Sequence, residues 1–118
     1  MPDNRRKYPR VSIHVPVSYA MLDSRGKVES EFFGVALDVS LGGLLLESTD
    51  FIETEYVGIS FIDTENKVAQ IKCKMVYSRK EGSGMVHTGL MFQGEDHEKS
   101  DFATKIIRGY FYRKKRLG

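Results

Sequence analysis

The chain has 118 residues, of which 41% are hydrophobic and 29% are charged, and its formal net charge is +2 at pH 7. This length fits one domain with a single core and excludes two domains of ordinary size. Because no apolar run approaches the roughly 18 residues that cross a bilayer, and no apolar segment follows the charged start, the sequence predicts a cytoplasmic protein without a membrane span or signal peptide.

Residues 1–10 are expected to form a basic arm ahead of the first strand. Arg6 and Arg10 make an R-x-x-x-R motif, and Arg5 adds a third arginine directly before it. Pro9 disfavours helical conformation in the residue that precedes it. The segment also has little apolar surface with which to offset the entropy of ordering. The sequence therefore predicts an extended arm that becomes ordered when it binds a partner.

Residues 11–94 are predicted to form six strands of an antiparallel barrel or sandwich. Large apolar side chains occupy every odd position of residues 11–21, which is the period of a half-buried strand. A turn then leads into a second alternation, whose core-facing residues are expected to be Phe33, Val35, Leu37 and Val39. Further strands are predicted at residues 44–46, 56–62, 68–79 and 85–92, with an acidic loop at residues 47–55.

The only cysteine, Cys73, lies in the predicted strand at residues 68–79. The alternation of this strand places Ile71, Cys73, Met75 and Tyr77 on the buried face. Cys73 is therefore expected in the core and not as a nucleophile. A single cysteine also excludes an internal disulfide and a cysteine-rich zinc site.

After Gly94 the apolar period becomes helical. An amphipathic helix followed by a basic tail is predicted over residues 95–118. Its packing stripe is expected to consist of Phe102, Ile106, Ile107, Tyr110 and Phe111. The fold class predicted by these patterns is all-β with a C-terminal helix.

A second motif, D-x-S-x-x-G, spans residues 38–43 at the end of the second strand. Period-two geometry places the side chains of Asp38 and Ser40 on the outer face of the sheet. A carboxylate accepts the N–H groups of a guanine edge, and a hydroxyl serves a base or a phosphate. Gly43 lets the backbone turn or come close to a ligand.

In this order the two motifs resemble the two-part signature of the PilZ family, R-x-x-x-R followed by [D/N]-x-S-x-x-G. Both parts match without a substitution, and the resemblance extends over nearly the whole chain. It implies a six-stranded antiparallel β-barrel with a C-terminal helix, which agrees with the alternation. It also implies a receptor for cyclic di-GMP that changes conformation and signals to an effector protein controlling motility, adhesion or exopolysaccharide.

The resemblance implies which residues contact the nucleotide. The two arginines of the arm would wrap the ligand, since a guanidinium pairs with guanine O6 and N7, stacks on the base or binds a phosphate. The extra arginine favours a stacked pair of ligand molecules. The expected ligand-binding residues are Arg5, Arg6, Arg10, Asp38, Ser40, Gly42 and Gly43.

Three other functions are less well supported by the sequence than a nucleotide receptor. An enzyme is disfavoured because His14, His87 and His97 are scattered and no nucleophile–base pair is visible, so no catalytic residue, metal site or cofactor is expected. The main alternative is a PilZ-fold interaction module that binds no nucleotide, although such members generally lack the arginine motif. Nucleic-acid binding is the least supported, because the chain has no recognition helix and no aromatic residues interleaved with basic ones on a strand face.

Overall fold

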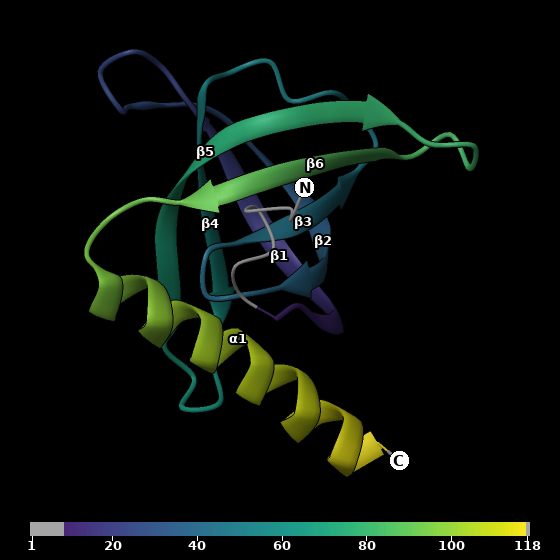
Figure 1. The fold of residues 1–118 in the computed structure, drawn as a ribbon, viewed down its shortest axis with the longest axis vertical. Coiled ribbons are helices and arrows are strands. Elements are labelled where there is room, and N and C mark those ends of the chain that lie inside the picture. The colour runs from purple at the N-terminus through teal and green to yellow at the C-terminus, as the bar shows by residue number, and fades with distance from the viewer. Residues whose placement is uncertain (1–8, 118) are drawn as a thin grey trace, which may run out of the picture.

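Residues 9–117 are described in the computed structural model, and they form six β-strands and one α-helix (Figure 1). The strands are β1 (Val11–Leu22), β2 (Val28–Val39), β3 (Gly43–Ser48), β4 (Tyr56–Ile62), β5 (Val68–Lys80) and β6 (Val86–Phe92), and the helix is α1 (Asp96–Leu117). All paired strands are antiparallel, and the sheet closes on itself in the order β1-β2-β3-β6-β5-β4. The prediction of a six-stranded antiparallel barrel with a C-terminal helix is confirmed.

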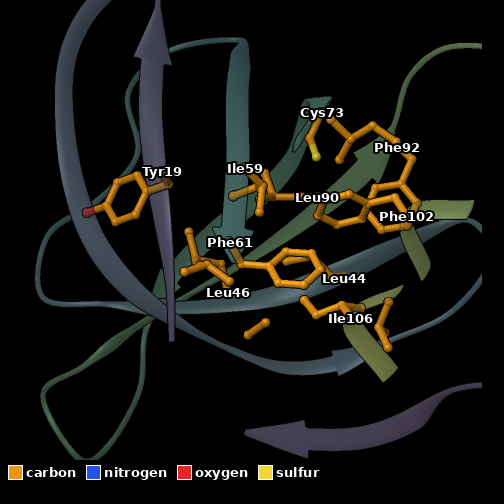
Figure 2. Close-up of a cluster of buried hydrophobic side chains, with 14 of the residues drawn as sticks. Tyr19, Leu44, Leu46, Ile59, Phe61, Cys73, Leu90, Phe92, Phe102 and Ile106 are labelled. Carbon is orange, nitrogen blue, oxygen red and sulfur yellow. The ribbon is translucent and has the colours of Figure 1, made fainter. Parts of the chain in front are cut away.

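The alternation of β1 builds one wall of the core. Ile13, Val15, Val17 and Tyr19 are buried, whereas His14 between them is exposed. The interior is filled by side chains from all six strands and the helix, and Figure 2 shows part of this cluster. Because burying one large apolar side chain contributes about 1.5–3 kcal/mol, this core is the main source of stability.

The first half of α1 is fixed to the barrel by aromatic packing. Phe102 lies edge to face against Phe61 of β4 and Phe92 of β6, with ring centroids 5.3 and 5.4 Å apart. Ile106, one turn further along, is fully buried. Ile107 and Tyr110 are partly buried and pack against the same core. The prediction of a packing stripe is confirmed for these four helical residues.

The C-terminal end of α1 extends past the barrel (Figure 1). Phe111, which the sequence predicts to pack, is 51% exposed, and residues 111–115 are all exposed. That part of the prediction is wrong, because the helix is longer than the barrel surface that it covers.

A β-bulge in β2 changes the side chains that face the core. The register of β2 against β3 shifts between Ala36 and Asp38, so the alternation is interrupted there. Val39 is buried as predicted, but Ala36 is the other buried residue of the strand, and Phe33 is 88% exposed. The predicted core face of β2 is therefore wrong before the bulge and right after it.

A second bulge reverses the direction of Tyr77. The register of β5 against β6 shifts between Met75 and Tyr77. Cys73 is fully buried and Met75 packs against the core, as predicted, whereas Tyr77 is 40% exposed. The predicted acidic loop also begins too early, because Glu47 belongs to β3.

Candidate functional site

The D-x-S-x-x-G motif forms a tight turn between β2 and β3. The backbone N–H of Ser40 donates to the carbonyl of Gly43 at 2.9 Å, and the N–H of Gly42 donates to Ser40 Oγ at 3.1 Å. The carbonyl of Gly42 accepts the N–H of Phe92 in β6, also at 2.9 Å. A serine hydroxyl that bonds the backbone two residues on is a common turn stabiliser. Ser40 therefore shapes the turn that ties β6 to the motif.

Gly43 is required by backbone packing. A Cβ added to it would overlap the carbonyl oxygen of Leu90 and would lie 3.1 Å from the carbonyl carbon of that residue. These atoms belong to the backbone of β6, so no side-chain rotation relieves the overlap. The glycine therefore lets β3 and β6 approach closely, a role that differs from the turn or the close approach to a ligand expected from the sequence.

Asp38 lies in a row of neighbours on the outer face of the barrel. It pairs with Ser12 of β1 and with Leu45 of β3, and the residues on either side of Leu45 are buried. The predicted outward direction of Asp38 is therefore confirmed. Its side chain is half-buried, and among residues 9–117 no side chain forms a hydrogen bond or ion pair with its carboxylate. The complete row, from β1 to β5, is Ser12, Asp38, Leu45, Gly89 and Tyr77.

The ring of Tyr77 covers Gly89 at the far end of this row. A Cβ on Gly89 would overlap the ring, and the guanidinium carbon of Arg79 lies 5.4 Å from the ring centroid. An aromatic side chain thus lies on the outer face in the same row as Asp38, with two strands, β3 and β6, between them. Sequence reasoning missed Tyr77 because it continued the alternation through the bulge. A glycine within the strand 86–92 was the available signal, since such glycines often mark close contacts.

The arm enters the barrel beside this face. Val11, the first residue of β1, pairs with Val39, so the backbone of the preceding residue, Arg10, lies near the turn that begins at Ser40; Arg10 is exposed. The other two predicted arginines, Arg5 and Arg6, lie outside the described residues. Asp38, Ser40, Gly42 and Gly43 thus belong to one strand end and turn, and the chain enters β1 beside them through Arg10.

These groups suit recognition of a flat polar ring joined to an anion. The carboxylate of Asp38 accepts N–H donors, Leu45 supplies an apolar floor, the ring of Tyr77 offers a stacking surface, and the guanidinium of Arg10 binds either ring acceptors or negative charge.

The described residues offer little for nucleophilic or metal chemistry. Burial raises the pKa of Cys73 to about 12, so its thiol stays protonated and enclosed in the core. Within residues 9–117 no three His, Cys, Asp or Glu side chains gather closely enough to hold a metal ion. Nor does the described part of the chain contain a helix long and apolar enough to span a membrane.

A separate hollow of about 640 Å³ lies away from the motif. It is bordered by the end of β1, the start of β2, β4, β5 and the beginning of α1. Its lining mixes small residues such as Gly58 with opposite charges such as Lys72 and Glu98. None of the predicted site residues that the structure describes lines it, so the motif face is the candidate site.

Comparison with known proteins gives one family match and several structural neighbours. The family model described as PilZ domain matches residues 4–111. Of the solved structures, the Bacillus subtilis inhibitor of motility, MotI/DgrA, has a TM-score of 0.65 at 15% identity, over 92% of this chain and 56% of that one. The PilZ domain of YcgR from Escherichia coli with c-di-GMP has a TM-score of 0.63 at 16% identity, over 96% of each chain.

The MrkH–c-di-GMP complex of K. pneumonia has a TM-score of 0.63 at 15% identity, over 97% of this chain and 56% of that one. At these identities the neighbours establish the fold. The chain spans about half the length of MotI/DgrA and MrkH. No curated protein matches the sequence.

Proposed function

Because the chain belongs to the PilZ domain family, we propose that it is a receptor for cyclic di-GMP, which binds on the outer face of the barrel around Asp38. The observation that carries this proposal is the pairing of Val11 with Val39 and of Ser12 with Asp38, which places the start of β1, directly after Arg10, beside the turn at residues 38–43. Two structural neighbours, YcgR and MrkH, were solved in complex with c-di-GMP, which further supports the proposal.

Each side chain has a role that follows from its chemistry. Asp38 accepts the N1–H and N2–H donors of a guanine, and Arg10 donates a bidentate pair to guanine O6 and N7 or binds a phosphate. Tyr77 stacks on the base, because aromatic rings bind any base through its flat face. Ser40 accepts a backbone N–H within the turn, and its hydroxyl proton remains able to donate to a phosphate oxygen.

The arm completes the proposed site. Arg6 lies four residues before Arg10 in the sequence, and Arg5 precedes it directly. We assign both to the ligand phosphates and bases, with Gly42 and Gly43 allowing the backbone to lie close to the nucleotide. The three arginines together favour binding of a stacked pair of ligand molecules.

The proposed output is a change of surface that a partner protein reads. Cyclic di-GMP carries two phosphate charges, which would neutralise the arginines and draw the arm across the face that contains Asp38. The protein would then act as an adaptor that passes the nucleotide signal to an effector in motility, adhesion or exopolysaccharide control.

Calorimetric titration with a panel of nucleotides tests this function. We expect cyclic di-GMP to bind more tightly than GMP, GTP or cyclic di-AMP, because adenine lacks the O6 acceptor and the N1–H and N2–H donors. Equal affinity for cyclic di-AMP would contradict the roles of Asp38 and Arg10. Absence of binding to every nucleotide would favour an interaction module of the same fold.

A further inference from the structure

A second polar row lies beside the row of Asp38 on the outer face of the barrel. Val35 of β2 pairs with Glu47 of β3, Glu47 pairs with His87 of β6, and His87 pairs with Arg79 of β5. Glu47, His87 and Arg79 each lie two positions along their strand from the corresponding residue of the first row, which is Leu45, Gly89 or Tyr77. Val35 does not follow this spacing because it lies before the bulge in β2. Because side chains alternate in direction along a strand, both rows face outward together.

Within this second row, Glu47 and His87 form a close polar contact. His87 Nε2 lies 3.1 Å from Glu47 Oε2, and only 22% and 25% of the two side chains are exposed. Among residues 9–117, no other side chain bonds to the carboxylate of Glu47. One oxygen is therefore fixed by the imidazole while the other remains able to accept donors from a ligand.

The spacing of the two rows matches the geometry of a folded dinucleotide. A strand rises about 3.2–3.4 Å per residue, so the row of Glu47 lies about 6.4–6.8 Å along the sheet from the row of Asp38. Stacked bases are about 3.4 Å apart. Two guanines that stack on opposite faces of a third ring are therefore separated by twice this spacing, which is about the distance between the rows. One guanine edge can face Asp38 while the other faces Glu47.

We propose that Glu47, held in place by His87, reads the second guanine of the ligand, so that the protein selects a cyclic dinucleotide with two guanines over one with a guanine and an adenine. This inference rests on the proposed function. Glu47 contacts the base, and His87 is a positioning residue that acts through it. Adenine would present its N1 acceptor to the carboxylate, which repels it, whereas guanine presents two donors.

Titration with cyclic di-GMP and with the mixed cyclic GMP–AMP tests the inference, because the two ligands differ in one base. The wild-type protein should prefer cyclic di-GMP roughly tenfold to a hundredfold. In Glu47→Gln this preference should fall to threefold or less, since the amide pairs with the adenine edge through its own donor and acceptor. Glu53→Gln, an equal change of charge at an exposed loop residue, should keep the wild-type preference.

The role of His87 is tested by the ratio of the two affinities. His87→Ala should lower the preference, and adding it to Glu47→Gln should change the ratio no further. If His87 were merely structural, its replacement would weaken the binding of both ligands equally and leave the ratio of their affinities unchanged. That result would overturn its positioning role.

The outcomes separate this inference from the proposed function. If the wild-type protein binds cyclic di-GMP and Glu47→Gln keeps the full preference over the mixed ligand, the second-guanine role is wrong while the receptor function stands. If the wild-type protein binds neither nucleotide, the receptor function itself is wrong. Thermal melting of each variant establishes that it is folded before titration.

Discussion

Replacing Gly43 with alanine tests whether the last glycine of the D-x-S-x-x-G motif serves the fold or only the ligand. The added Cβ would overlap the carbonyl oxygen of Leu90 and lie 3.2 Å from the Cα of Met91. Ordinary carbon contacts lie at about 3.5–4.0 Å. Because the opposing atoms are backbone, β3 and β6 must move apart.

The cost follows from what this movement disturbs. Overpacking a closely fitted site costs about 1–3 kcal/mol. The two 2.9 Å hydrogen bonds of the turn, from Ser40 to Gly43 and from Phe92 to Gly42, would lengthen, and each contributes about 1 kcal/mol. Alanine also lowers the conformational entropy of the unfolded chain, which offsets about 0.4–1 kcal/mol of this destabilisation. The net destabilisation is about 2–4 kcal/mol, or a fall in Tm of roughly 8–16 °C at about 4 °C per kcal/mol.

Thermal denaturation without ligand, followed by circular dichroism, measures this effect. Gly82→Ala is the matched control, because Gly82 is exposed and an added Cβ there meets no atom within 4 Å. Its Tm should change by about 2 °C or less, as for most surface substitutions. If Gly43→Ala melts within about 2 °C of the wild type but fails to bind nucleotide, the packing argument is wrong and the glycine serves the ligand.

Four further outcomes are expected. Arg10→Ala should weaken cyclic di-GMP binding roughly tenfold to a hundredfold by calorimetry with an unchanged Tm, and Arg10→Lys should not restore the affinity because the bidentate fork is lost. Normal affinity of the alanine variant would remove Arg10 from the site. Tyr77→Ala should lose roughly tenfold to a hundredfold in affinity for cyclic di-GMP, whereas Tyr77→Phe and the distant control Phe111→Ala should bind it normally. A large loss of affinity in Tyr77→Phe would argue against stacking. Amide hydrogen exchange of residues 6–10 should slow on adding cyclic di-GMP while residues 71–75 change little, and identical exchange with and without ligand would exclude ordering of the arm. Because burial raises the pKa of Cys73 to about 12, the thiol should react with Ellman's reagent at pH 8 only as the protein unfolds, and rapid reaction of the native protein would contradict its enclosure.

The sequence alone determines those features that depend on local periodicity. The odd-position alternation of residues 11–21 identifies β1 and its buried face, and the helical spacing of Phe102 and Ile106 identifies the part of α1 that packs. The outward direction of Asp38 and the burial of Cys73 follow from the same period. These predictions succeed because they require only the directions of neighbouring side chains on one element.

The tertiary structure decides what lies beside what, and where a pattern is interrupted. A bulge is an extra residue relative to a partner strand, so the shifts near Asp38 and Tyr77 have no expression in the period of either strand alone. The exposure of Phe111 likewise depends on where the barrel ends beneath the helix. Glu47 and His87 are 40 residues apart in sequence, and only the register of β3 against β6 brings their side chains into contact.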